Sequence, residues 1–405
     1  MPTVRIAFFL LAFTAGMFGS RGAFAQKLNP ADPHVLEARV VDIFSRSCAR
    51  AGCHIGPLPQ QEMDLSKDRF YAAVVGTPSR ERPDLMRVRP GDPEHSYLVK
   101  KVRGDADIIG VQMPLIGEKL SAEEVATIEA WVRSIGTVDE ARVKATPKSD
   151  PMAFAGWQIV NAPTARMPRS GEFLFRISHR FNPKISDGYD ALYGLDGSGI
   201  IFLSFGYAPT DNFFFSLGRS NAADDVELQL KYRAARQTRD AAMPVNVAFQ
   251  GSINWITEKI PGKSRFRDDA VKAAGQAVIS RAVSDRIGVA LVPGMLLNPS
   301  SDSHGEDPLF TLGLGGRWQF HHNISLVGEW VPIVTGYIRT TTFGNENRFD
   351  SWGGGIEFAT SGHIFQIIVT NSVGIATDQY MNGGDLDIRD GDLRFGFNIY
   401  RTLSF

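Results

Sequence analysis

The chain has 405 residues, of which 43 are Lys or Arg and 44 are Asp or Glu, so its formal net charge is −1. This balance gives no reason to expect nucleic acid binding, which needs a basic surface. No stretch after residue 25 has the 18 consecutive apolar residues of a transmembrane helix. We therefore expect any membrane span to be a closed β-barrel.

The first 25 residues have the three parts of a secretory signal peptide. Arg5 supplies the positive charge, residues 6–18 form an apolar run too short to span a membrane, and residues 23–25 (Ala-Phe-Ala) form a cleavage site. We expect the mature chain to begin at Gln26. Export would bring it to a compartment in which disulfides form and c-type haem is attached.

The only two cysteines, Cys48 and Cys53, come just before His54 in the sequence Ser-Cys-Ala-Arg-Ala-Gly-Cys-His. Two thiols followed by a histidine can hold a haem covalently, because each thiol adds to one vinyl group and the imidazole can bind the iron. The usual spacing is C-x-x-C-H, whereas four residues separate the cysteines here. The alternative interpretation is a small disulfide loop, which an exported protein would allow.

Two amphipathic helices are predicted to flank this motif. Residues 34–45 carry apolar side chains at near-helical spacing and lead into Cys48. Ser121 and Glu124 form a capping box, followed by an apolar stripe that ends at Gly136. Two such helices around a haem motif are typical of a small cytochrome c, so residues 30–137 are expected to form an all-α haem domain.

Met113 is the candidate for the second axial ligand of the haem iron. It precedes a proline in the loop before the second helix, and its thioether is a soft ligand that suits haem iron. Met63 and Met86 are rival candidates, whereas His34 and His95 are expected to be solvated. The alternative role for Met113 is to fill a gap in the hydrophobic core.

Residues 30–137 resemble the monohaem cytochrome c-like domains of bacterial exported proteins. The resemblance rests on five stretches: Ile43-Phe44, Gly52-Cys53-His54, Val88 to Pro93 with Ser96-Tyr97-Leu98, Met113-Pro114, and Leu120 to Trp131. It implies one covalent haem c with His54 and Met113 as axial ligands. By the same resemblance, Tyr97 and Leu98 would line the haem pocket.

Residues 138–170 are rich in Pro, Lys, Arg, Ala and Met and have no steady period. They are expected to form a linker with little structure of its own, although some of their apolar side chains could contact a neighbouring surface.

After residue 171 the hydrophobic period changes from helical to two. In residues 226–232, for example, Val, Leu, Leu and Tyr alternate with Glu, Gln and Lys. A soluble β-sandwich also alternates in this way, but the connections here are short at one end and long at the other, as in outer-membrane barrels. We expect an antiparallel transmembrane β-barrel of about 12 strands over residues 171–405. The expected strand starts are near residues 172, 198, 211, 225, 245, 272, 286, 308, 323, 351, 363 and 392.

The chain ends on an apolar-alternating strand whose last residue is Phe405. This ending resembles the β-signal read by the outer-membrane assembly machinery. Residues 362–372, 392–398, 178–181 and 213–219 resemble a family of bacterial membrane barrels with a domain-of-unknown-function label. That resemblance implies a barrel and brings no catalytic residues.

Two histidine-containing groups could suggest chemistry in the barrel. Ser178, His179 and Asp187 lack the spacing of any known triad. His321 and His322 lie on an expected tight turn without Cys or carboxylate partners at ligand spacing. We therefore expect no catalytic residues and an electron carrier rather than an enzyme.

Together these patterns predict an all-α cytochrome c-like domain followed by an antiparallel transmembrane β-barrel. The barrel would lie in the outer membrane, in contact with the lipid bilayer, with the haem domain in the periplasm. The haem would exchange electrons with a periplasmic or surface redox partner, since one haem cannot carry an electron across about 30 Å of hydrocarbon. The alternative is an outer-membrane channel or receptor barrel with a haem-bearing or disulfide-stapled docking domain.

Overall fold

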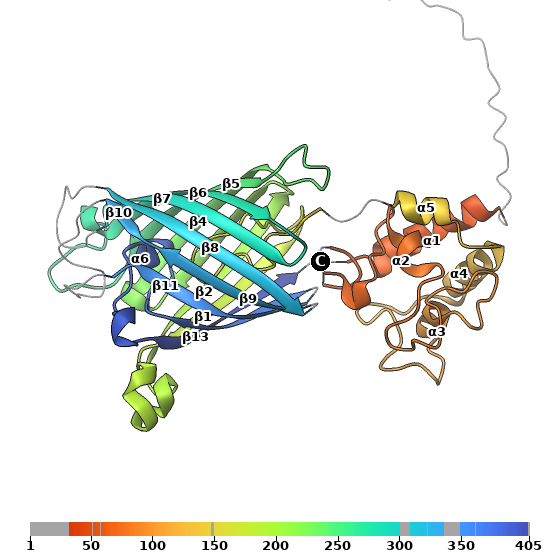
Figure 1. The fold of residues 1–405 in the computed structure, drawn as a ribbon, viewed down its shortest axis with the longest axis horizontal. Coiled ribbons are helices and arrows are strands. Elements are labelled where there is room, and N and C mark those ends of the chain that lie inside the picture. The colour runs from red at the N-terminus through yellow and green to blue at the C-terminus, as the bar shows by residue number, and fades with distance from the viewer. Residues whose placement is uncertain are drawn as a thin grey trace, which may run out of the picture.

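The computed structural model describes residues 32–50, 52–56, 58–146, 150–299, 308–321, 323–335, 349–360 and 362–403. The expected signal peptide, residues 1–25, lies outside the described residues, as do His322 and Phe405. The chain forms a helical unit followed by a β-barrel (Figure 1).

The helical unit contains α1 (Pro33–Ser47), α2 (Phe70–Val74), α3 (Tyr97–Arg103), α4 (Ala122–Ser134) and α5 (Glu140–Ala145). The two predicted helices are confirmed as α1 and α4, and they pack against each other. The capping box of α4 is present: Ser121 Oγ accepts from the N–H of Glu124 at 3.3 Å, and Glu124 accepts from the N–H of Ser121 at 2.7 Å. In the part of the chain that is described, no helix has the length and apolar character needed to cross a bilayer.

The apolar stripes of these helices build one core. Its members from α1 and α4 are Leu36, Val40, Ile43, Phe44, Ile128, Trp131 and Val132. Cys48 belongs to the same core, so the predicted haem motif begins at the end of α1 in the interior of the helical unit.

The barrel is a closed antiparallel sheet. Its strands are β1 (Phe173–Phe181), β2 (Gly199–Thr210), β3 (Phe213–Ser220), β4 (Asp225–Ala235), β5 (Asn246–Ile256), β6 (Val271–Ala282), β7 (Ile287–Leu297), β8 (Leu309–His321), β9 (Ile324–Val331), β10 (Ile333–Thr335), β11 (Ser351–Ala359), β12 (His363–Thr370) and β13 (Arg394–Leu403). β9 and β10 both pair with β8 and are separated only by Pro332, so they count as one interrupted strand and the total is twelve. Pairing of β1 with β13, with Ile177 opposite Ile399, closes the barrel.

The predicted strand starts agree with the observed ones to within two residues, and the predicted two-residue period separates the barrel's two faces. On β2, for example, the outward-facing Leu203 and Phe205 are 46% and 48% exposed, whereas the inward-facing Phe202 is 1% exposed. Apolar side chains cover the outside, as expected for contact with lipid.

The two ends of the barrel differ in their connections. Short turns join β2 to β3, β6 to β7 and β8 to β9, whereas residues 182–198, which include η2 (Ile185–Gly194), join β1 to β2 at the opposite end. Both the start of β1 and the end of β13 lie at the short-turn end, and the helical unit lies beside this end (Figure 1). The Cα atom of Gly362, before β12, is 3.3 Å from an ideal Cβ position at Gly52, so the two units are in contact.

The linker prediction for residues 138–170 is wrong for most of this range. Residues 140–145 form α5, and nearly all residues from Ala153 to Pro168 are buried. The reason is that this segment enters the barrel and bonds to inward-facing side chains of the strands. We call residues 150–169 the N-terminal plug.

A second segment also fills the interior. Residues 371–386 include α6 (Thr377–Met381), and all residues from Asn371 to Asn382 are buried. The sequence predicts a long external loop here, but the loop folds back into the barrel (Figure 1). We call residues 371–386 the C-terminal plug.

Candidate functional site

The two cysteines and His54 lie together in a turn that follows α1. The N–H of His54 donates to the carbonyl oxygen of Cys48 at 3.2 Å, and the N–H of Cys53 donates to that of Arg50 at 3.0 Å. Cys48 is buried and Cys53 is half-buried, and both thiols are free. The structure therefore brings together the three residues that the sequence predicts to hold a haem.

Both thiols are protonated at neutral pH. Burial raises the pKa of Cys48 to about 12, with a smaller contribution from the neighbouring Cys53. Burial also raises the pKa of Cys53, although the nearby Arg50 opposes this effect. The two sulfur atoms are thus held close together as neutral thiols.

His54 is 9% exposed and its ring orientation is fixed. Its Nδ1 lies 3.2 Å from the carbonyl oxygen of Gln60, so Nδ1 carries the proton of the neutral ring and Nε2 is the nitrogen without it. Burial lowers the pKa of His54, against the opposing effect of the Gln60 carbonyl, and the ring is therefore neutral at neutral pH. A neutral imidazole oriented in this way is the form in which histidine binds a metal.

Arg87 holds the loop that carries Gln60. Its guanidinium donates to the carbonyl oxygens of Gln61 at 2.5 Å and Ala73 at 2.7 Å, and its side chain is buried. Sequence reasoning misses Arg87, because no local pattern distinguishes it from the neighbouring arginines on the surface.

Tyr97 and Leu98 begin α3, and both are buried. Leu98 belongs to the same core as Cys48. The hydroxyl of Tyr97 donates to the carboxylate of Glu81 at 2.9 Å and accepts from the N–H of Ile109 at 2.9 Å. Leu98 thus shares a core with the motif, whereas Tyr97 fixes the loop that leads to Met113.

The three candidate methionines occupy different positions. Met113 lies on the loop between α3 and α4, where its N–H donates to the carbonyl oxygen of Lys101 at 2.9 Å and its side chain is half-buried. Met63 follows η1 (Gln60–Glu62) and packs at the edge of the core, and Met86 is 39% exposed. Met113 is therefore on a separate loop from the turn that holds His54.

The loop around Met113 leaves large apolar side chains exposed. Ile109, Val111, Leu115 and Ile116 are 50%, 53%, 62% and 61% exposed. Exposed apolar groups gathered on one short segment mark a surface that a ligand or a partner covers.

The set Ser178, His179 and Asp187 is not assembled into a site. Ser178 faces the barrel interior and accepts a hydrogen bond from Arg176 at 2.8 Å. His179 faces outward, where its ring stacks on Phe397 with centroids 5.2 Å apart. Asp187 caps the first turn of η2.

The structure also describes His321, whose Nδ1 lies 3.0 Å from Oδ1 of Asn323 in the turn after β8. Across the described ranges, no group of three or more His, Cys, Asp or Glu side chains is placed to hold a metal ion.

A single carboxylate holds the tip of the N-terminal plug. Glu329, which points inward from β9, accepts hydrogen bonds from the N–H groups of Val160, Asn161 and Ala162 at 3.0, 2.9 and 2.9 Å. Both carboxylate oxygens are used, and the side chain is buried. Charged acceptors make stronger hydrogen bonds than neutral ones, so Glu329 is the main polar anchor of this tip.

Side chains from neighbouring strands add further contacts to the plug tip. Arg180 donates to Oδ1 of Asn161 at 2.8 Å, Gln366 donates to the carbonyl oxygen of Ile159 at 3.0 Å, and Asn398 donates to that of Val160 at 3.0 Å. These partners come from β1, β12 and β13, which follow β9 and β11 in the sheet order, so one contiguous part of the wall holds the plug tip.

The C-terminal plug is anchored in the same manner at the long-loop end. The N–H of Thr377 donates to Glu227 at 2.8 Å, and Gln276 donates to the hydroxyl of Tyr380 at 2.7 Å. Tyr380 and Met381 share one apolar cluster with Ile159 of the N-terminal plug. Both plugs therefore meet in one apolar cluster inside the barrel.

Inward-facing glycines are the sequence signal for the plugs. A Cβ added at Gly288 on β7 would overlap the carbonyl oxygen of Ala153. A Cβ added at Gly353 on β11 would lie 2.8 Å from a methyl group of Val160. Glycine within a strand often marks the close approach of another backbone, and here it marks the path of the N-terminal plug.

A family model described as "Membrane bound beta barrel domain (DUF5777)" matches residues 154–403. The matched range includes most of the N-terminal plug as well as every strand. No curated protein matches the chain.

Among solved structures, the NanC porin has a TM-score of 0.36 and 8% identity, covering 57% of this chain and 100% of its own. The KdgM porin has a TM-score of 0.35 and 10% identity, covering 58% and 99%. An outer membrane channel from Pseudomonas putida F1 has a TM-score of 0.36 and 14% identity, covering 59% and 97%. Likeness at this level does not indicate a shared function.

Proposed function

The chain belongs to the family of membrane bound beta barrel domains (DUF5777), and from this premise we propose that it is an outer-membrane protein that carries one c-type haem for electron transfer. The barrel anchors the helical unit at the membrane. The helical unit, on the periplasmic side, exchanges electrons with a periplasmic or surface redox partner.

The observation that carries this proposal is the geometry of His54. Its ring is buried, and its Nδ1 donates to the Gln60 carbonyl, so Nε2 is the nitrogen that would bind a metal. Cys48 and Cys53 lie in the same turn as free thiols. A disulfide loop would not require an oriented, desolvated histidine beside it.

The exposed apolar loop around Met113 also supports a bound haem. Ile109, Val111, Leu115 and Ile116 would be covered by an apolar macrocycle seated between this loop and His54. Haem supplies a one-electron redox couple when bound. Cys48 and Cys53 would hold the haem through thioether bonds to its two vinyl groups, and His54 would bind its iron.

The filled interior supports an anchor rather than an open pore. Both plugs are buried, and they share one apolar cluster. The haem unit would then act at one face of the membrane, because a single haem at the barrel mouth is too far from the other face for direct transfer.

Covalent haem retention tests the proposal. The full chain is expressed in a host that matures c-type haem, and a haem stain is read on a denaturing gel. We expect a stained band for the wild type and its loss in Cys48→Ser with Cys53→Ser. His54→Ala should retain a stained band but show an altered reduced spectrum. Cys-dependent mobility under non-reducing conditions without haem stain would instead indicate a disulfide loop.

A transport barrel is the second candidate function, and one feature of the N-terminal plug favours it. The plug bonds to the wall through side chains such as Glu329 and Gln366 and does not pair as a strand, so it could leave without disrupting the sheet. Steady conductance of the wild type in planar bilayers would favour this function over the anchor.

A further inference from the structure

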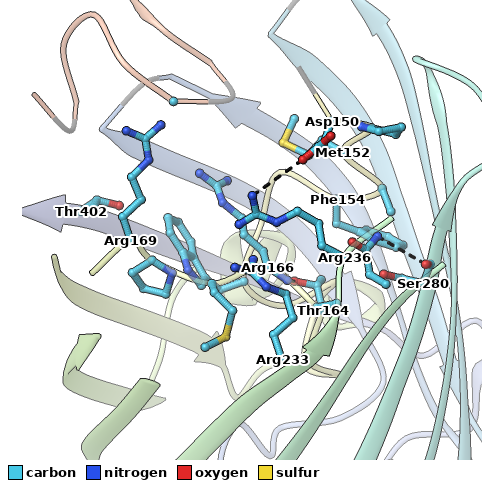
Figure 2. A pocket seen from close by; sticks show the side chains of 18 of the residues that line it. Asp150, Met152, Phe154, Thr164, Arg166, Arg169, Arg233, Arg236, Ser280 and Thr402 are labelled. Atoms are coloured by element: carbon cyan, nitrogen blue, oxygen red, sulfur yellow. Dashed lines mark hydrogen bonds and ion pairs between the residues drawn. The ribbon is translucent and has the colours of Figure 1, made fainter. Parts of the chain in front are cut away.

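A polar cavity of about 230 Å³ lies at the short-turn end of the barrel, between the N-terminal plug and the barrel wall. The backbone of Gly52 and Gly56, from the helical unit, forms part of its rim. Figure 2 shows the side chains of Arg166, Arg233 and Arg236 pointing into this space. The cavity is thus lined by guanidinium groups from both the plug and the wall.

The carboxylates that line the cavity do not match these cations. Asp150 approaches Arg236 only to 3.8 Å, which is the edge of ion-pair range. Glu172 accepts from the backbone N–H of Arg169, another lining arginine, at 2.9 Å. Positive charge therefore exceeds negative charge on the lining.

Arg166 supplies the most specific observation. Its Nη1 is buried and has no hydrogen-bond acceptor among the residues that the structure describes. The guanidinium stacks on the ring of Trp157 at 4.1 Å from the centroid, which fixes its plane. Buried polar groups normally have partners, so the protein's own acceptors do not saturate the guanidinium of Arg166.

Arg233 is held in place by the wall. It donates to the carbonyl oxygen of Asp211 at 2.6 Å and to Oδ1 of Asn212 at 3.1 Å, and neither contact neutralises its charge with a carboxylate. Arg166, fixed by Trp157, and Arg233 are thus preorganised, which lowers the entropic cost of binding a ligand between them.

We propose that this cavity is a binding site for a small oxyanion of two or more negative charges, a phosphate or a carboxylate. Guanidinium groups recognise both by paired N–H···O bonds. The volume is below that of pockets for drug-sized ligands, which limits the occupant to a small molecule. The site does not require a bound haem and is independent of the electron-transfer function.

Titration calorimetry on the purified full chain in detergent tests the site, with inorganic phosphate and citrate as separate probes at low ionic strength. We expect saturable binding of at least one probe by the wild type. Arg236→Gln and Arg166→Gln should each raise the Kd about tenfold or more, because each removes a charge-assisted bond. Arg236→Lys should give an intermediate Kd, since it keeps the positive charge but cannot form the paired N–H···O bonds of a guanidinium.

Arg239→Gln is the matched control, because Arg239 is in the same connection as Arg236 but pairs with Asp285 at 3.3 Å and does not line the cavity. Its Kd should stay within about twofold of the wild type, as expected for a screened surface charge. Absence of saturable binding in the wild type overturns the proposal. So does an equal loss in Arg239→Gln, or unchanged binding in both Arg166→Gln and Arg236→Gln.

Discussion

Glu329 on β9 accepts the backbone N–H of Asn161 at 2.9 Å, across 168 positions of the sequence. This contact joins the wall of the barrel to a segment that enters from the helical unit. It is one of three bonds that the same carboxylate makes to consecutive residues at the plug tip.

Glu329→Gln should loosen the N-terminal plug. An amide has one acceptor oxygen, and its NH₂ group would face backbone donors, so at least one buried N–H loses its partner. The contact between the plug and the wall should be weakened by about 1.5–3 kcal/mol, the range for hydrogen bonds to charged groups. The measurement is the rate of trypsin cleavage after Arg166 and Arg169 in the folded protein, which should increase.

Glu258→Gln is the control for this change, because Glu258 is exposed in the connection between β5 and β6. Its cleavage rate should equal that of the wild type. Equal rates in all three proteins would show that Glu329 does not hold the plug.

Gly288→Ala should displace the plug by direct overlap. The added Cβ would collide with the carbonyl oxygen of Ala153, a backbone atom that cannot rotate away. We expect ion conductance in planar bilayers to rise above the wild-type level. Gly316→Ala on the adjacent β8 is the matched control, because a Cβ there meets no atom within 4 Å. A conductance increase in both variants, or in neither, would contradict the proposed path of the plug.

The strands could be predicted from the sequence, but the plugs could not. Alternation is a local property, so residues such as Leu228 and Glu227, which are 40% and 1% exposed, identify their own faces. The burial of Val160 depends on Glu329 and Asn398, which are 169 and 238 positions away. A segment rich in Pro, Lys and Arg reads as a linker when those partners are unknown.

The candidate site also divides into features that short sequence patterns predict and features that depend on distant residues. Helices α1 and α4 and the capping box follow from short patterns, and the turn that joins Cys48 to His54 follows from adjacency. The orientation of His54 depends on Gln60 and on Arg87, and no local pattern indicates that role. The assignment of Met113 as an iron ligand stays a prediction.

Glu124 should give the helical unit a measurable pH dependence. The N–H of Ser121 is the main cause of its lowered pKa, with further help from Arg46, whose guanidinium lies 2.5 Å from the carboxylate. Because the folded pKa lies below the unfolded value of 4.5, the stabilisation is present above pH 4.5 and is lost as the pH falls through the folded pKa.

Glu124→Gln should therefore lower the thermal midpoint of the helical signal in far-UV circular dichroism at pH 7 more than at pH 3. The effect of the substitution on the free energy of unfolding should differ between the two pH values by less than about 1 kcal/mol, because the carboxylate is near solvent. Glu123→Gln, one position earlier and exposed, should show no such pH-dependent difference. Identical pH profiles for Glu124→Gln and the wild type would exclude this role of the capping box.

Met113→Ala should separate the three candidate methionines once the full chain carries a covalent haem. A thioether ligand raises the reduction potential of haem iron relative to water or a nitrogen ligand. We expect Met113→Ala to lose the Met–iron charge-transfer band and to lower the reduction potential. Met86→Ala should change neither, because Met86 is 39% exposed on a different segment.

Met63→Ala is the more demanding comparison, because Met63 follows η1 and packs at the edge of the core near the loop that orients His54. It should reduce the stability of the helical unit while leaving the charge-transfer band in place. Loss of the band in Met63→Ala, with its retention in Met113→Ala, would identify Met63 instead of Met113 as the second axial ligand. The exposed loop of Ile109, Val111, Leu115 and Ile116 would then be a partner surface and not a haem wall.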